Sequence, residues 1–497
     1  MALTITPTIG SLVSIYIFLR VLLFLTQDAR EPPAIETSIP FLGPLLGLIR
    51  GKTQYYVALR DKFKLPLYTL RLPFSRIYVL SSPDLISPVQ KQWRTLNFAP
   101  FSSGAGKVLG MSKQSLEVMH EGLSDRDGYS ASMARHMSLV LGPGEDLDAI
   151  NRRSIELFLD DLKTLAISGN TRNPLRDPKT KDAWKLFEES FLTLAISPLP
   201  SLLSRKILQA RETLAAAMIK YMLKGGHEKA SALVRMRHDV HASGYNFSLE
   251  DIARGELGNT FAVLGNTTPS AWWFLYHVFS DPAVLADIRR ELEACIQVDS
   301  KTNTHSIDLA CIRTSCPILL STFQEMLRFR ALNAGPRMVM EDVDVNGFLL
   351  KKGNILMIPA PVHHTDITAW GESATVFDHM RFARKFAPGK KGQTRVAFRA
   401  FGGGHVLCPG RHFASMEIMA LGALLVLQFD IKPVAGRWTE PKCDNSPLAT
   451  GFPVPDHDIP VEFVARHPER QWRVSFTRSS EAMGIVSEDA PSTSNRI

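Results

Sequence analysis

The chain has 497 residues, of which 45% are hydrophobic and 21% are charged, and its formal net charge is +8. These values are ordinary for a folded globular protein and exclude a disordered or fibrous chain. Because no long run of lysine or arginine with interleaved aromatic residues occurs, nucleic acid is a poor candidate partner. A basic surface suits an acidic membrane or an acidic partner protein, and a dispersed basic surface with no partner is the alternative.

The N-terminus contains an almost wholly apolar stretch, Ile9 to Leu25, in which Arg20 is the one charge. Its length lies at the short end of the range for a helix that spans a membrane. Basic residues follow the stretch and none precedes it, so the positive-inside rule places the rest of the chain in the cytosol. A cleaved signal peptide is the alternative, but the basic n-region and a clear small-residue cleavage site are missing. We therefore expect residues 1–30 to form an uncleaved, single-pass membrane anchor.

The rest of the chain is predicted to be mainly α-helical with a small β portion. Two short strands are predicted over 66–72 and 76–82, around a turn that contains Pro73. Short strands return after Pro336, and the polar segment 479–497 is predicted to be a disordered tail behind a catalytic domain of residues 31–478. Between these parts the hydrophobic period is helical, and helices are expected over 150–167, 204–223, 248–280, 281–296 and 316–330.

The five cysteines are odd in number and irregularly spaced, and no C-x-x-C pair occurs. This pattern argues against a disulfide framework and against a zinc site. A reducing environment that faces the cytosol fits such cysteine usage.

Two patterns on predicted helices carry ionisable or hydroxyl groups. Glu325 and Arg328 form an E-x-x-R pair whose spacing puts both charges on one helix face, although an exposed surface pair is the usual interpretation. The long predicted helix contains Gly265 followed by Asn266, Thr267, Thr268 and Pro269. A kink at the proline with capping hydroxyls is the simplest interpretation of that segment.

The most informative segment is FGGGHVLCPGRHFA, residues 401–414, which places Cys408 in a glycine-rich loop before an apolar helix. The glycines leave the backbone without side-chain bulk on both sides of the sulfur, so a large flat ligand can lie against it. Backbone N–H groups and the following helix N-terminus favour a thiolate there. Such a thiolate suits an axial haem ligand, and a buried turn with an inert cysteine is the alternative.

The spacing F-x-x-G-x-x-x-C-x-G, carried by Phe401, Gly404, Cys408 and Gly410, resembles the haem-binding signature of the cytochromes P-450, the haem-thiolate monooxygenases. The resemblance covers about residues 35–475. It implies a cytochrome P-450 fold behind the N-terminal anchor helix, and a haem (iron protoporphyrin IX) whose axial thiolate ligand is Cys408. Phe401, Gly404 and Gly410 would line that cofactor.

The resemblance also assigns roles to charged residues outside the loop. Arg337 and His405 match positions that face the haem propionates, and an ordinary surface charge is the alternative for each. Glu325 and Arg328 match the family's buried charge pair, which Arg381 completes as a structural network. His379 departs from this pattern, because the family often has proline there.

The long helix departs from the family in one place. The family usually has an acid and a threonine here, which relay protons to the site of oxygen activation. Asn266 stands where the acid is expected, or where the threonine is expected under a one-residue shift. The pattern G-N-T-x-P resembles the sterol 7α-hydroxylase and prostacyclin synthase branch, which holds both monooxygenases and a non-redox isomerase. The resemblance implies that Asn266, Thr267 and Thr268 are the catalytic residues of this helix.

The resemblance implies a monooxygenase that oxidises a lipophilic small molecule of terpenoid, steroid or polyketide type with O2. Electrons would come from an NADPH-cytochrome P-450 reductase, with cytochrome b5 as a second candidate donor. The implied location is the endoplasmic reticulum membrane, with the catalytic domain facing the cytosol. A haem-thiolate isomerase or dehydratase that needs no reductase is the first alternative, which Asn266 motivates. A non-catalytic haem-binding protein is the second.

Overall fold

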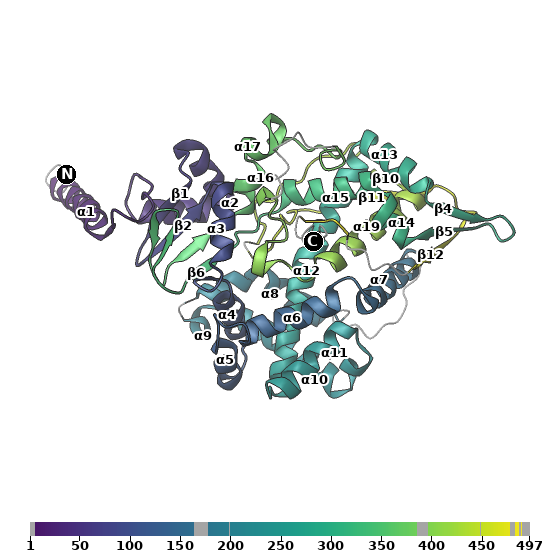
Figure 1. The fold of residues 1–497 in the computed structure, drawn as a ribbon, viewed down its shortest axis with the longest axis horizontal. Helices are drawn as coiled ribbons and strands as arrows, with labels where there is room; N and C mark the ends of the chain where they lie inside the picture. Colours follow the sequence, from purple (N-terminus) through teal and green to yellow (C-terminus); the bar gives the residue numbers. More distant parts are fainter. Residues whose placement is uncertain are drawn as a thin grey trace, which may run out of the picture. The chain divides into compact units, whose positions relative to one another are not determined.

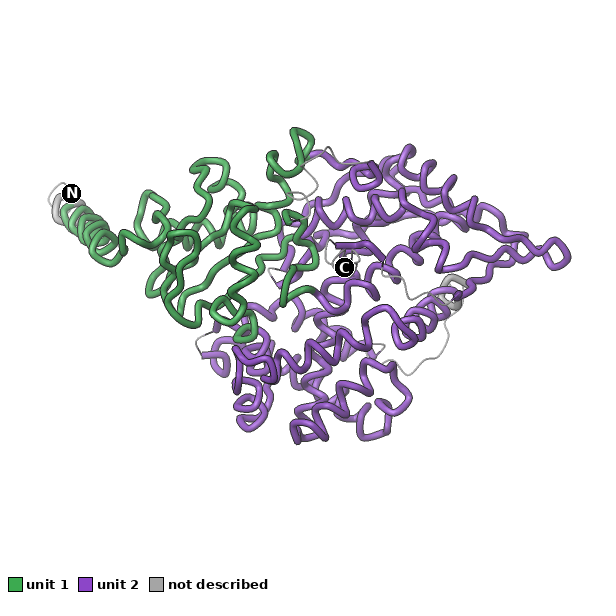
Figure 2. The backbone as a smooth tube through the Cα atoms, viewed as in Figure 1, with its two compact units in different colours: residues 1–101, 332–375, 387–407 green, residues 102–331, 376–386, 408–497 purple. Residues whose placement is uncertain are grey.

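The computed structural model describes residues 5–163, 177–197, 199–384, 396–447, 449–477, 483–486 and 489. It consists of two compact units, which Figure 2 shows in different colours. Unit 1 contains residues 1–101, 332–375 and 387–407, and unit 2 contains residues 102–331, 376–386 and 408–497. Most elements of the described chain are helices and its strands are short, so the predicted mainly α fold with a small β portion is confirmed.

Unit 1 is built on a five-stranded sheet with the order β1-β2-β9-β6-β3. The first two strands form the predicted hairpin, in which Leu67 pairs with Leu80 and Leu72 pairs with Ser75. A second hairpin joins β7 to β8. The strands are β1 (Leu67–Leu72), β2 (Ser75–Leu80), β3 (Leu96–Asn97), β6 (Arg337–Val339), β7 (Val343–Val345), β8 (Phe348–Leu350) and β9 (Ile355–Met357).

Apolar side chains from these strands form the core of unit 1, because alternate residues of β1 and β2 are fully buried on each face. The helices and turns of unit 1 are α1 (Ile5–Thr26), α2 (Leu42–Phe63), η2 (Pro83–Leu85), α3 (Ile86–Lys91), α16 (Ala360–His364), α17 (Ile367–Trp370), η6 (Glu372–Thr375) and η7 (Gly404–Val406). Parts of the chain that are far apart in sequence therefore meet in this unit, since β9 pairs with β2.

Helix α1 corresponds to the predicted membrane anchor. Its apolar side chains are largely exposed, and Phe24 and Leu25 retain 81% and 73% of their accessible surface. Of the residues that the structure describes, none belongs to a helix that is both long and apolar enough to cross a membrane. The predicted membrane span is therefore not confirmed.

Unit 2 is mainly helical, and α12 (Leu249–Ser280) packs against α10, α13, α15 and α19 (Figure 1). The predicted start of α12 is confirmed, because the Ser248 side chain caps it by accepting a hydrogen bond from the Asp251 N–H. The other helices are α4 (Ala99–Leu109), which begins in unit 1, α5 (Lys113–His120), α6 (Tyr129–Leu141), α7 (Glu145–Lys163), α8 (Pro178–Ile196), α9 (Pro200–Leu203), α10 (Arg205–Leu223), η4 (Gly226–Lys229), α11 (Ala232–Asp239), η5 (Val240–Gly244), α13 (Pro282–Glu293), α14 (Leu309–Ser315), α15 (Pro317–Arg330) and α19 (Arg411–Gln428).

Two small sheets complete unit 2. One has the order β12-β5-β4, and the other pairs β10 with β11 in antiparallel register. Their strands are β4 (Ile296–Asp299), β5 (Thr304–Asp308), β10 (Phe429–Pro433), β11 (Val461–Ala465) and β12 (Gln471–Ser475).

The β4–β5 hairpin corrects the interpretation of the cysteines. Cys295 precedes β4, and Cys311 lies on α14 directly after β5, so the hairpin returns the chain and brings their Cα atoms within 6.2 Å. The two residues form a disulfide. The expectation that no disulfide links these cysteines is therefore wrong for this pair. Cys316 lies beside it, with its sulfur 3.6 Å from that of Cys295.

The predicted disordered tail is also corrected in part. Met483 and Ile485 are buried, and the Gln324 side chain donates hydrogen bonds to the carbonyls of Gly484 and Ile485 at 3.0 and 2.9 Å. Asp489 accepts a hydrogen bond of 2.9 Å from Arg411. Apolar burial and these hydrogen bonds order the described residues of the tail, and the rest of 479–497 lies outside the described residues.

His277, on α12, makes the stability of the fold depend on pH. It is buried, stacks on Phe377 with 3.9 Å between ring centroids, and accepts a hydrogen bond from Arg330 at 3.0 Å. Burial first, and then the Arg330 charge, lower the pKa of His277 to about 3. The unfolded chain binds this proton near pH 6.5, so the stabilisation is complete above that pH and is lost as the pH falls toward 3.

We expect wild-type protein to lose about 2 kcal/mol more unfolding free energy than His277→Gln between pH 7 and pH 5, measured by urea unfolding. Glutamine keeps an acceptor for Arg330 and does not titrate in this range. Equal losses in the two proteins would contradict the assignment to His277.

Candidate functional site

Cys408 lies in unit 2, three residues before α19 begins. Burial raises the pKa of its thiol, and the backbone N–H groups of Gly410 and Arg411, together with the Arg411 charge, oppose that shift. Arg411 is fixed in place, because its guanidinium also donates to the Cys408 carbonyl at 3.1 Å and to Asp489. The predicted N–H groups thus point at the sulfur.

This environment fits an iron-bound thiolate. A buried thiol keeps its proton unless a cation replaces it, and a coordinated metal ion does so outright. A Cβ atom at Gly410 would lie 3.9 Å from the Cys408 sulfur, an ordinary contact distance, so the backbone of Gly410 runs close to the sulfur. The Cys408 sulfur, as a thiolate, is therefore a suitable soft ligand for a haem iron.

The preceding part of the loop belongs to unit 1, and Gly404 is conformationally constrained there. Its φ is +59°, and an added Cβ would lie 3.2 Å from the Gln90 side chain, so both backbone and space favour glycine. Phe401 is half-buried in the same unit. His405 is exposed and its ring lies 4.5 Å from that of Trp93, measured between centroids.

Unit 1 also contains two buried guanidinium groups, on Arg337 and Arg399. Burial, and then the charge of Arg399, lower the pKa of Arg337 to about 10. Arg337 donates to the Pro336 carbonyl at 2.7 Å, and within the described chain it forms no ion pair with a carboxylate. Because a buried cation is costly without an anion, Arg337 fits the carboxylate of a haem propionate.

Sequence reasoning missed Arg399. Its guanidinium packs against the glycine loop so closely that a Cβ atom at Gly403 would clash with it. The run of glycines indicated that a bulky side chain packs against the loop, but it did not identify that side chain as Arg399.

The predicted catalytic residues of α12 carry an amide and two hydroxyl groups, which differ chemically from the thiol and guanidinium groups described above. Asn266 uses both ends of its amide: it donates to the Ala262 carbonyl at 2.9 Å and accepts from the Gly451 N–H at 2.9 Å. It therefore fastens the turn around Gly451 to the helix. An amide engaged in this way holds no proton for transfer, so the geometry gives Asn266 a positioning role.

Thr267 and Thr268 follow Asn266, and their hydroxyl groups differ from that of Ser270 in their hydrogen bonds. Thr267 is half-buried and Thr268 is exposed, and no hydrogen bond from either hydroxyl is formed within the described residues. Ser270 instead donates to the carbonyls of Asn266 and Thr267 at 2.7 and 3.0 Å. Its hydroxyl thereby supports the helix beside Pro269, whose nitrogen carries no hydrogen.

The predicted charge network is assembled in unit 2. Glu325 and Arg328 are fully buried, and the Glu325 carboxylate accepts two hydrogen bonds of 2.7 Å from Arg328. Arg381 adds a third partner at 3.0 Å. Both guanidinium groups also donate to the Val376 carbonyl, so the structure brings all three predicted residues together. His379 lies nearby and contacts Asp287 at 3.0 Å.

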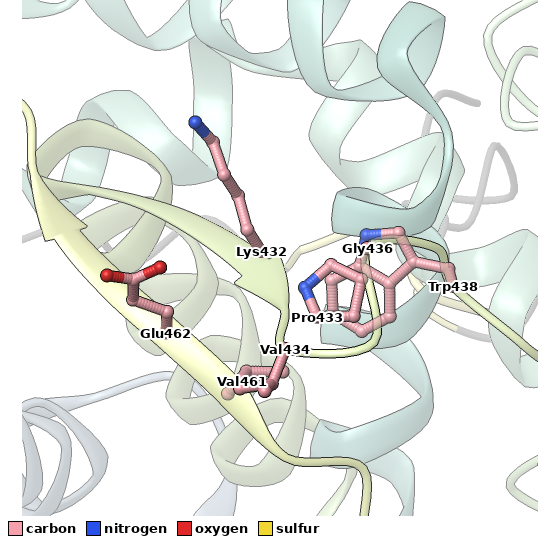
Figure 3. A pocket seen from close by; sticks show the side chains of 7 residues that line it. All are labelled: Lys432, Pro433, Val434, Gly436, Trp438, Val461 and Glu462. Atoms are coloured by element: carbon pink, nitrogen blue, oxygen red, sulfur yellow. The ribbon is translucent and has the colours of Figure 1, made fainter.

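A shallow surface pocket of about 750 Å³ lies between β10 and β11 of unit 2 (Figure 3). Its lining consists of Lys432, Pro433, Val434, Gly436, Trp438, Val461 and Glu462. None of the predicted site residues belongs to this lining, so the pocket does not mark the catalytic site.

Known proteins are similar to this chain in sequence and in fold. The sequence model of the cytochrome P450 family matches residues 180–460. A cytochrome P450 monooxygenase of Hypoxylon pulicicidum, nodJ, is 34% identical over 88% of this chain and 90% of its own length. The cholesterol 7-alpha-monooxygenase of Cricetulus griseus is 24% identical over 58% of this chain and 59% of its own. The solved structure of retinoic acid bound cyanobacterial CYP120A1 has a TM-score of 0.65 at 18% identity, and the match covers 88% of this chain and all of that one.

Proposed function

Because the chain belongs to the cytochrome P450 family and is a haem-thiolate monooxygenase, we propose that it oxidises a lipophilic small molecule with electrons from an NADPH-cytochrome P450 reductase. The observation that carries this proposal is the Cys408 sulfur, with two backbone N–H groups directed at it. The bound haem supplies the oxidative chemistry. Cys408 would hold its iron, and the family resemblance assigns Arg337 and His405 to its propionates.

The substrate class is proposed from the relatives and from the apolar surroundings of α12. Phe191 of α8 stacks on Phe261 of α12 with 4.3 Å between ring centroids, which supports an apolar ligand on this side of the helix. The relative from Cricetulus griseus is named for cholesterol, a steroid. This name supports a steroid, and terpenoids and polyketides are the other candidate classes.

We also propose that α1 attaches the protein to the endoplasmic reticulum membrane, with the catalytic part facing the cytosol. The exposed apolar side chains of α1 support this, because a lipid surface would cover them. The net charge of +8 suits an acidic membrane and an acidic electron donor, either the reductase or cytochrome b5.

A second candidate function is a haem-thiolate isomerase or dehydratase that rearranges a peroxide without a reductase. Asn266 favours it, because the amide replaces a proton-relay residue and is engaged at both ends. A non-catalytic haem-binding protein is the third candidate, and it predicts neither a product nor a spectral response to lipophilic compounds.

One experiment separates these functions. The purified protein is screened with terpenoids, steroids and polyketides, first for a substrate-induced shift of the Soret band and then for product with reductase, NADPH and ¹⁸O₂. We expect a product that carries one ¹⁸O atom and forms only with NADPH. A rearranged product from a hydroperoxide, formed without NADPH and without ¹⁸O, would establish the isomerase instead. No shift and no product with any compound would favour the haem-binding protein.

A further inference from the structure

Helix α12 carries no carboxyl group beside the segment that departs from the family pattern. Its acidic residues are Glu250, Asp251 and Glu256, all in the first part of the helix. Asp251 accepts hydrogen bonds from Ser112 and Ser115, and Glu256 pairs with Arg237. These acids therefore have structural partners, and α12 itself supplies no acid for proton transfer near Asn266.

A carboxylate from another helix reaches this place. Glu188, on α8, has its Oε1 atom 3.3 Å from the position that a Cβ atom on Gly265 would occupy. The glutamate thus lies where a side chain of residue 265 would begin. When Asn266 is aligned with the family's threonine, Gly265 falls at the position of the family's acid, so the carboxyl group is present but comes from α8.

Pro269 leaves one backbone carbonyl of α12 without its helical donor. Pro269 has no N–H, so the Gly265 carbonyl lacks the donor that the fourth following residue gives in an uninterrupted helix. A carbonyl without its helical donor can accept a hydrogen bond from a water molecule instead.

The surroundings of Glu188 favour a carboxyl group that carries a proton. Burial raises the pKa of Glu188, the negative charge of Glu189 raises it further, and a hydrogen bond from Trp184 opposes them. From α12 the neighbour of the Glu188 carboxyl group is Gly265, which does not titrate. Among the described residues, no cation forms an ion pair with Glu188. The residue is half-buried and follows exposed Lys185 by one turn of α8, so solvent can return its proton.

We propose that Glu188 supplies, from α8, the proton-donating carboxyl group that α12 lacks. In each turnover one C–H bond of the substrate, O2, NADPH and one proton become a C–OH group, water and NADP⁺. Glu188 gives its proton through a water molecule toward the oxygen atom that leaves as water, and takes a proton from solvent afterwards. This inference rests on the monooxygenase reaction of the proposed function.

The first test reads the protonation of Glu188 without turnover. Infrared difference spectra are recorded on the reduced, carbon-monoxide-bound protein before and after photodissociation of the carbon monoxide. We expect a carboxylic-acid C=O band that persists above the ordinary pKa of glutamate. The band should be absent in Glu188→Gln and retained in Glu189→Gln, the matched control, because Glu189 is exposed on the same helix. A band that survives in Glu188→Gln would overturn the proposal.

The second test measures NADPH consumption with the reductase. We expect Glu188→Gln to lower the rate by about 100-fold, Glu188→Asp to recover part of it, and Glu189→Gln to leave it unchanged. Equal rates in Glu188→Gln and wild type would overturn the proposal. If Glu188→Gln fails to fold with haem, the Asp variant decides, through a shifted carboxyl band and an intermediate rate. Wild-type protein that consumes no NADPH would count against the monooxygenase reaction, while the infrared band would still report on Glu188.

Discussion

Cys408→Ser is expected to abolish the red-shifted Soret band of the reduced, carbon-monoxide-bound protein. That band requires a thiolate on the iron, and serine offers a hydroxyl that is a poor ligand and a far weaker donor of electron density. Mutation of a residue that supports a metal ligand commonly lowers activity by about 10–100-fold. Loss of the ligand itself should lower it at least as much, so NADPH-driven product formation should fall by roughly 100-fold or more. The measurement is the difference spectrum of detergent-solubilised protein, recorded beside the rate.

Cys443→Ser is the matched control, because Cys443 is a second free, half-buried cysteine of unit 2. Burial raises the pKa of the Cys443 thiol to about 11, and no glycine-rich loop surrounds it. The control variant should keep both the band and the rate. A thiolate-type band that persists in Cys408→Ser, or its loss in Cys443→Ser alone, would contradict the assignment of the ligand.

Glu325→Gln should be the most destabilising single change in the charge network. The carboxylate of Glu325 is the shared acceptor of Arg328 and Arg381, and all three side chains are almost fully buried. Removing its charge takes away the buried carboxylate that both guanidinium groups share, which costs about 3–5 kcal/mol. The free energy of unfolding in urea and the amount of haem incorporated measure the effect.

Glu293→Gln is the control for this change. Glu293 pairs with Arg466 at 3.3 Å, but its side chain is 51% exposed, so the loss should stay within about 1 kcal/mol. Similar losses of stability in the two variants would show that burial of the Glu325 network contributes little.

Local signals explain which parts of the molecule could be predicted. The β1–β2 hairpin follows from β-branched and aromatic residues on both sides of Pro73, and α12 begins where Ser248 caps it. The loop at Cys408 was recognisable because its chemistry is contained in ten consecutive residues. In each case the residues that determine the structure are neighbours in the chain.

The features that sequence reasoning missed depend on contacts between distant segments. Cys295 and Cys311 meet because the β4–β5 hairpin returns the chain, and hydrophobic patterning does not fix that register. Arg399 packs on the glycine loop, and Glu188 reaches Gly265 from a different helix. A motif search along α12 shows that the acid is absent, but it cannot identify Glu188 on α8 as its replacement.

The packing of the last described residues has a genetic consequence. Asp489 contacts Arg411 at 2.8 Å and His412 at 3.4 Å, directly behind the Cys408 loop. A premature stop codon at position 483 would leave every haem-binding residue in the chain and would still remove this support. Nonsense and frameshift alleles that remove Asp489 should therefore behave as loss-of-function alleles.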